Sequence, residues 1–167
     1  MKTSIISFAF SVMFLGNYAF AQCRDFDAQH QFQSRFKVAQ GIVQDNKTHL
    51  TWQRCSVGTT WSSDNSCSGE IEYMSLSDAK QMAATLADGW RIPNIEELSS
   101  LLELSCTEPS INAEVFPGVK DMGEGAPYWS ISEVAGIPTM FYFIDFWEVM
   151  VDGHSNQFPL ALRLVRD

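Results

Sequence analysis

The chain has 167 residues, of which 46% are hydrophobic and 13% aromatic. This length and composition allow one domain with a packed core and exclude a largely disordered chain. The formal net charge of −9, from 20 acidic and 11 basic residues, opposes binding to nucleic acid or to an anionic membrane surface.

The first 21 residues have the pattern of a secretory signal peptide. Lys2 supplies a short positive region, residues 5–15 form an apolar run, and residues 19–21 form a small-x-small cleavage signal. The apolar run is too short to span a bilayer comfortably. The residue before Cys23 is not small, which disfavours lipid attachment. We therefore expect cleavage after Ala21 and a soluble mature protein, either periplasmic or secreted.

Export would place the four cysteines in an oxidising compartment, where disulfides form. None of their spacings is Cys-x-x-Cys, so neither a redox motif nor a zinc ribbon is indicated. Four cysteines allow three pairings. We predict Cys55–Cys67, which brackets a turn-rich loop, and Cys23–Cys106, which ties the N-terminal segment to the end of a helix. The three histidines lie far apart in the sequence, so no metal site is predicted.

The sequence pattern changes at Phe36, from a polar segment to strand-like runs. Residues 22–35 are polar without a clear period, and the folded domain is expected over residues 36–167. Residues 41–55, GIVQDNKTHLTWQRC, predict a hairpin with Leu50 and Trp52 on one face. The following stretch up to the third cysteine is rich in Ser, Thr, Asn and Gly, and it is predicted to be a loop.

Two helices are predicted next. The first begins at Ser75, has Asp78 in the capping-box position, and ends at Gly89. The second has Asn94 as its N-cap and Glu97 three positions later. Its two adjacent glutamates do not share a helix face, so they suit the helix N-terminus better than a catalytic carboxylate pair.

The second half of the chain is rich in strand signals. Residues 107–127 contain three prolines and three glycines and predict a long irregular connection. Strand-like runs then cover residues 128–132, 139–146, 147–153 and 160–166. The aromatic run over residues 140–151 is expected to be sheet core rather than a sugar-stacking platform. Strands, two helices and further strands indicate an α+β fold with mixed or antiparallel sheets.

Several sequence blocks follow one another at characteristic spacing: GIVQDNKTHLTWQRC, GWRIPNIEELSSLLE, PSIN, VFPG, YWSIS and LRLVRD. In these blocks the chain resembles the Lcl C-terminal domain family, named for the end domain of a collagen-like bacterial adhesin. The resemblance covers residues 36–166 and implies a C-type lectin-like fold with a long irregular loop region. No Gly-x-y collagen tract is present, so a trimer is not implied.

The resemblance also assigns a structural role to the WRIPN block. It implies that Trp90, Arg91 and Pro93, with Asn94 as N-cap, shape the junction between the second helix and the sheet. We expect Trp90 to pack in the core. We expect Arg91 to be largely buried, with its guanidinium bonded to backbone carbonyls or to a carboxylate.

No catalytic residue and no cofactor is predicted. Serine nucleophile elbows, glycine-rich phosphate loops and metal-binding histidine pairs are absent from the sequence. The related formylglycine-generating domains need cysteines in a late segment, and none follows Cys106. The Glu-Pro-Asn and Gln-Pro-Asp signatures of calcium-dependent sugar-binding lectins are absent too. We therefore expect a non-enzymatic protein.

Two functions fit this description. The first is an exported, disulfide-stabilised binding or adhesion module that recognises a glycan or a surface protein. The alternative is a structural or accessory component of a bacterial envelope or pilus-type assembly. The acidity favours protein, neutral-glycan or cation-assisted contacts over anionic glycans.

Ligand binding is predicted in loops, because the fold constrains their sequence least. These loops are the long connection over residues 107–127, the loop after YWSIS and the hairpin around Trp147. The alternative is that the long connection is a solvent-exposed link with no role in binding. The candidate ligand-binding residues are Glu133, Asp145, Trp147 and Glu148.

Overall fold

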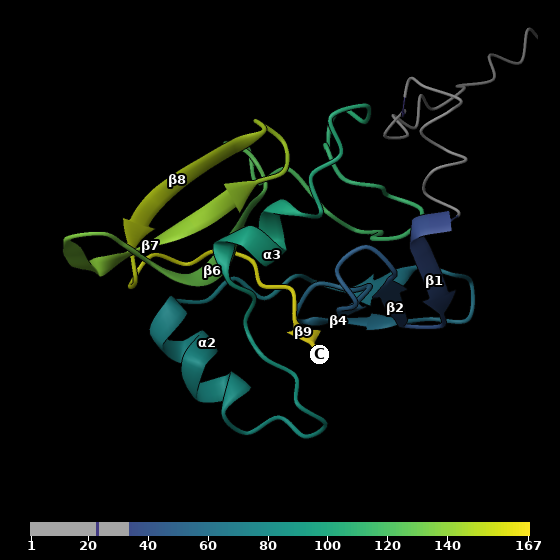
Figure 1. Ribbon diagram of the computed structural model, residues 1–167, viewed down its shortest axis with the longest axis horizontal. Coiled ribbons are helices and arrows are strands. Elements are labelled where there is room, and N and C mark those ends of the chain that lie inside the picture. The colour runs from purple at the N-terminus through teal and green to yellow at the C-terminus, as the bar shows by residue number, and fades with distance from the viewer. Residues whose placement is uncertain (1–22, 24–33) are drawn as a thin grey trace, which may run out of the picture.

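The computed structural model describes Cys23 and residues 34–167 (Figure 1). The predicted signal peptide and most of the 22–35 segment lie outside these residues. The described part is an α+β domain with antiparallel sheets and two helices, as the sequence predicts. None of its helices is both long enough and apolar enough to cross a membrane.

One sheet joins the two ends of the domain. Its antiparallel strands, in spatial order, are β1 (Phe36–Ala39), β2 (Ile42–Asp45), β3 (Thr51–Gln53) and β9 (Val165–Arg166). The β2–β3 pair is the predicted hairpin. Trp52 is fully buried and Leu50 packs against the same core, which confirms the face assigned to them.

The loop predicted between Cys55 and Cys67 contains a paired ribbon. The strands β4 (Thr59–Trp61) and β5 (Cys67–Gly69) pair antiparallel. Their turn is held by a Ser66 Oγ–Asp64 hydrogen bond of 2.7 Å and by the Ser62 N–H donating to the Ser66 carbonyl at 2.9 Å. The turn-forming side chains dominate the composition of this segment, which is why the prediction of a plain loop is wrong.

The two helices begin where their caps predict. Ser75 caps α2 (Leu76–Ala83) by accepting from the Asp78 N–H at 3.1 Å. The helix ends at Ala83, short of the predicted Gly89, because the following residues turn back in a tighter pattern of backbone bonds. Asn94 caps α3 (Ile95–Ser99), and its capping box with Glu97 is complete.

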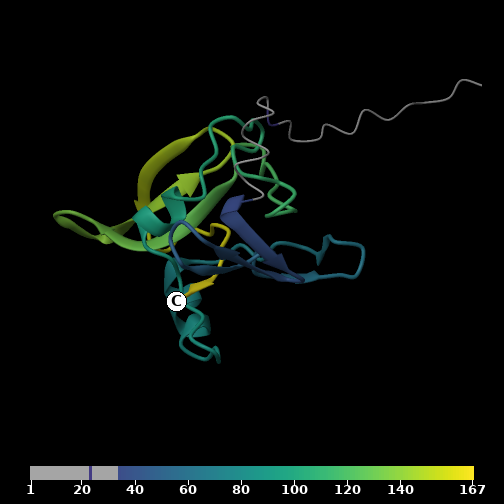
Figure 2. The same cartoon turned by 45° about the vertical axis from the view of Figure 1, so that its right-hand side comes forward.

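A second sheet consists of β6 (Pro127–Val134), β7 (Ile137–Asp145) and β8 (Met150–Ser155), in that order. Trp129, Phe141 and Phe143 belong to one hydrophobic cluster together with residues of α2. Tyr128 and Ile144 belong to a second cluster, shared with the β1–β9 sheet. Figures 1 and 2 show the two sheets side by side, with α2 below their junction.

Residues 160–166 were predicted to be one strand, but only the last two pair in a sheet as β9. The rest of the segment passes between the two hydrophobic clusters. Leu160, Leu162 and Leu164 point into the α2 cluster, while Ala161 and Val165 point into the other. The alternation therefore sorts side chains between two cores.

Arg163 lies on the second of these sides and is fully buried. Its guanidinium donates to the carbonyls of Gln53, at 3.0 Å, and of Arg54, and to Ser56 Oγ at 3.3 Å. Its Cζ lies 5.0 Å from the centre of the Phe116 ring. Burial lowers the pKa of Arg163. The segment is held by hydrogen bonds to carbonyl oxygens and by an aromatic ring.

Candidate functional site

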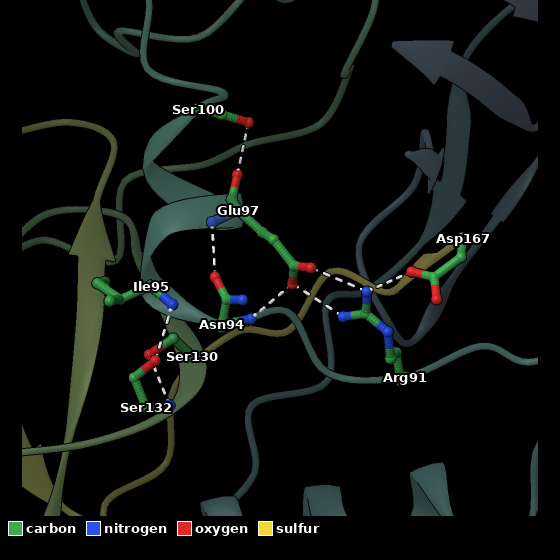
Figure 3. A network of polar contacts seen from close by, with 8 residues as sticks. All are labelled: Arg91, Asn94, Ile95, Glu97, Ser100, Ser130, Ser132 and Asp167. Atoms are coloured by element: carbon green, nitrogen blue, oxygen red, sulfur yellow. Dashed lines mark hydrogen bonds and ion pairs between the residues drawn. The ribbon is translucent and has the colours of Figure 1, made fainter. Parts of the chain in front are cut away.

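The WRIPN block forms a polar network at the start of α3 (Figure 3). Arg91 donates to both carboxylate oxygens of Glu97 at 2.8 Å each, and to Asp167 at 2.6 Å. Glu97 also accepts from the Asn94 N–H at 2.8 Å, while the Asn94 side chain accepts from the Glu97 N–H at 2.8 Å. The Arg91 backbone pairs with Val165 at 2.8 and 3.0 Å. One arginine thus joins α3, β9 and the C-terminal aspartate.

The ionisation of this network follows from its geometry. The hydrogen bonds to Glu97 raise the pKa of Arg91, against the effect of burial. Burial raises the pKa of Glu97, but the bonds from Arg91 and Asn94 outweigh it and hold that pKa below its ordinary value. The expected carboxylate partner is therefore present. The expectation of a largely buried Arg91 is wrong, because 38% of its side chain is exposed.

Trp90 is also less buried than the sequence suggests. It packs against the edge of the α2 cluster, and the guanidinium of Arg166 lies 4.7 Å from its ring centre. The fully buried tryptophans are Trp52 and Trp129. Pro93 is buried, and its carbonyl accepts from the Ile131 N–H at 2.8 Å. The block therefore acts as a clamp between helix and sheet.

The predicted hairpin around Trp147 is the turn between β7 and β8, and Asp145 supports it from inside. Asp145 is 2% exposed. Its Oδ1 accepts from the N–H groups of Trp147 at 2.8 Å, Glu148 at 3.0 Å and Ala126 at 3.0 Å. Asp145 was predicted to contact a ligand from the surface, but the structure buries it under the turn because its oxygens satisfy three backbone donors.

The end of the long connection lies against this turn. The Phe146 N–H donates to the Ala126 carbonyl at 3.1 Å. Gly125 has a φ of +104°, and a Cβ there would lie 2.0 Å from the Asp145 carboxylate. Asp121 closes the loop by accepting from the N–H groups of Gly123 at 2.8 Å and Gly125 at 2.9 Å. Only glycine fits the approach of the loop to Asp145.

We call residues 121–125 and 146–150 together the loop–turn surface. Its exposed apolar side chains are Met122, Val149 and Met150. Trp147 is partly buried and packs against the core beneath. Its acidic side chains are Asp121, Glu124 and Glu148, and neither stretch contains a lysine or arginine. The surface therefore combines acidic and apolar side chains.

The exposed apolar part of this surface differs from what the sequence predicts. It assigned residues 140–151 to the sheet core, whereas Val149, Met150 and Val151 are exposed. Phe141 and Phe143 before them are buried on β7, so one hydrophobic run contains both core and surface. A turn signal at residues 146–149 would have separated the two parts, but that stretch contains no Gly, Pro, Asn or Asp.

Glu133 lies away from the loop–turn surface. It sits in β6 rather than in a loop, near the β6–β7 turn. Pro127, which pairs with Asp145, is at the other end of the same strand. Six residues of extended chain separate the two positions, or about 20 Å. The structure thus brings Trp147 and Glu148 together and leaves Glu133 at the opposite end of the sheet.

Two further features bear on the chemistry. An open pocket of about 490 Å³ lies beside α2, between the segment before this helix and the segment after β8. None of the predicted ligand-binding residues lines it. Among the described residues, no three or more His, Cys, Asp or Glu side chains gather in a way that could hold a metal ion.

Two disulfides brace the domain. Cys55 is joined to Cys67 and Cys23 to Cys106, which is the predicted pairing. Cys106 is fully buried in the core shared by the two sheets. Disulfides of this kind fit a protein of an oxidising compartment, either extracellular or periplasmic.

These features define a disulfide-stabilised α+β domain with clamped ends and a rigidly supported acidic surface. The model of the Lcl C-terminal domain family matches residues 41–166, and the chain belongs to that family. A search of curated proteins gives no match.

Proposed function

We propose that the protein is an exported, non-enzymatic binding or adhesion module that contacts its ligand through the loop–turn surface. The observation that carries the proposal is an exposed apolar and acidic surface whose backbone is fixed from below by Asp145. Membership of the Lcl C-terminal domain family and the two disulfides fit such a module. The ligand class favoured by the charge is a protein or a neutral glycan.

The geometry gives the surface two properties that recognition requires. First, the turn is preorganised, since three of its neighbouring N–H groups already bind Asp145 and need no reordering on ligand contact. Second, the surface contains an aromatic side chain, Trp147, and two exposed methionines, Met122 and Met150, a combination that suits contact with apolar ligand groups. The carboxylates of the same surface would select against anionic ligands.

The test is a binding screen of the mature protein against glycans and surface proteins, with and without calcium. Glu148→Lys should weaken binding of the identified ligand about tenfold, the effect of one desolvated charge contact. The melting temperature should stay unchanged, since Glu148 is exposed. Trp147→Ala should weaken binding further, with some loss of stability because the ring is partly buried.

Glu133→Lys is the matched control, because it makes the same charge change at the far end of the sheet. It should leave binding unchanged. Equal loss of binding in the Glu133 and Glu148 variants would show that net charge alone drives the interaction. Binding that survives both Glu148→Lys and Trp147→Ala would place the ligand elsewhere. A ligand found only in envelope assemblies would favour the structural or accessory role.

A further inference from the structure

The outer strand of the second sheet, β8, has an open edge in the described part of the chain, where it pairs only with β7. Figure 1 shows it along the rim of the molecule. Two of its side chains are unusually exposed for apolar residues, Met150 at 41% and Val151 at 48%. Natural edge strands are commonly protected by proline, lysine or a bulge. The sequence of β8, MVDGHS, contains neither proline nor lysine, and its pairing with β7 is regular over all six residues.

The two faces of β8 differ in chemistry. Val151 pairs with Ile144 and Asp152 with Phe143, so neighbouring residues of β8 point to opposite sides of the sheet. One face of the edge therefore presents Val151, and the other presents the Asp152 carboxylate next to Met150. A strand laid along β8 would meet an apolar neighbour on one face and a negative one on the other.

A second carboxylate lies just before this edge strand. Glu148 is exposed two residues before β8. Asp152 lies within the strand itself and is exposed. Asp152 also accepts from the Gly153 N–H at 2.7 Å, which occupies one backbone donor of the edge strand. Electrostatic complementarity therefore favours an incoming strand with lysine or arginine.

We propose that the β8 edge binds an extended segment of a partner protein in which apolar residues alternate with lysine or arginine. This inference rests on the proposed function and describes the kind of partner that would bind at the same end of the domain. The added strand would gain main-chain hydrogen bonds from the alternate residues of β8 that do not bond to β7, although the Gly153 N–H is already bound by Asp152. Its apolar side chains would cover Val151, and its cations would lie beside Asp152 and Glu148.

Pairing of β8 with a second copy of the same chain is opposed by charge. Asp152 lies at the middle of the six-residue strand. A symmetric antiparallel pair would therefore bring the two Asp152 carboxylates close together across the interface, which is destabilising. The formal net charge of −9 on each chain adds to this repulsion.

The probe is the capped peptide acetyl-Lys-Val-Lys-Val-Lys-Val-amide, titrated into the isotope-labelled mature protein. We expect the amide signals of β8 to shift most. Two matched peptides separate the contributions. One carries an N-methyl group on every residue, which removes the backbone donors of both edges and keeps every side chain, and the other replaces lysine with glutamate. Both should bind at least about tenfold more weakly than the probe.

Variants of the protein complete the test. Asp152→Asn retains an acceptor for the Gly153 N–H and removes the charge, so the fold should persist while the lysine peptide binds about fivefold more weakly. Asp152→Lys should weaken it more, and Glu133→Lys should have no effect. Equal affinity for the N-methylated peptide, or shifts centred away from β8, would overturn strand addition. Dimerisation abolished by Asp152→Lys would assign the edge to a second copy instead.

These outcomes are separable from those of the proposed function. The edge inference would fail alone if the peptide did not bind while Glu148→Lys and Trp147→Ala still weakened binding of a ligand found in the screen. The proposed function would fail if neither Glu148→Lys nor Trp147→Ala weakened the binding of any ligand found in the screen.

Discussion

At the scale of single residues, Arg91 shows how one planar side chain connects distant parts of the chain. Its guanidinium binds both oxygens of Glu97 and also reaches Asp167. An ammonium group cannot reproduce the paired bonds to Glu97. Arg91→Lys should therefore lower the free energy of unfolding by about 1 kcal/mol, a modest value because the pair is partly exposed.

Urea denaturation of the protein measures this loss, and Arg166→Lys serves as a control on the neighbouring strand. A variant as stable as the wild type that had lost ligand binding would make Arg91 a binding residue and contradict the clamp role.

Asp45 makes the stability of the fold depend on pH. Burial raises the pKa of Asp45, but hydrogen bonds from Arg35, the Lys47 N–H and Thr48 lower it below its ordinary value. Stability from such a carboxylate is fully present above the unfolded pKa and is lost as pH falls through the lower folded pKa. Asp45→Asn should cost about 3 kcal/mol at pH 7, since it leaves a mostly buried arginine without its partner.

The measurement is urea unfolding of wild type and variant at pH 7, 5 and 3. The difference between them should shrink below about pH 4, the ordinary range for an unfolded aspartate. A difference that stayed constant with pH would show that the carboxylate charge is not its source.

The sequence alone predicts only some of the contacts and burial of these residues. The Asn94 and Glu97 capping box and the hairpin position of Trp52 follow from local rules and are confirmed. The burial of Trp90 does not follow, because it depends on how closely the α2 cluster and Arg166 approach the ring. Asp145 was placed on the surface because acidic residues usually are, and only the fold reveals the three N–H groups around it.

At the scale of elements, the joint between the long connection and the β7–β8 turn depends on Gly125. Its positive φ and the 2.0 Å approach of an added Cβ to Asp145 leave no room for a side chain. Gly125→Ala should cost about 3 kcal/mol, from backbone strain and displacement of the buried carboxylate.

Gly123→Ala is the matched control, because its φ is also positive but nothing lies within 4 Å of the added Cβ. It should cost about 1 kcal/mol from strain alone. Thermal unfolding compares the two variants, and hydrogen exchange should accelerate at Trp147 and Glu148 only in the first. Equal effects would mean that the contact with Asp145 contributes nothing.

Element types were more predictable than element extents. The capped starts of α2 and α3 and the β7–β8 hairpin agree with the sequence. The end of α2 differs, because tighter turns after Ala83 compete with continued helix. Residues 160–164 read as a strand since alternation looks the same for a segment between two cores as for one between core and solvent.

At the scale of the whole molecule, the two disulfides should contribute unequally. Cys23–Cys106 spans 83 positions and Cys55–Cys67 spans 12. Loop-closure entropy assigns about 4–5 kcal/mol to the first and about 3 kcal/mol to the second. Replacing both cysteines of a pair by serine avoids free thiols, and guanidinium unfolding gives each loss. A greater loss from the shorter loop would show that native contacts, rather than chain entropy, decide the difference.

The α+β class and the family were predictable because they rest on the order of many short blocks along the chain. Of the candidate site, only the hairpin around Trp147 was predictable from the sequence. The separation of Glu133 from Trp147 depends on strand length and register, which the sequence pattern does not define at β-bulges such as those in β6.

The position of Val165 has a consequence for how the protein is made. This residue pairs with Trp52 in β3 and, through its backbone, with Arg91. The segment before it supplies side chains to both hydrophobic clusters. A ribosome delivers the chain from its N-terminus, so both clusters lack one wall until residue 165 has emerged. We therefore expect the nascent chain to complete both hydrophobic clusters only after that segment has left the ribosome.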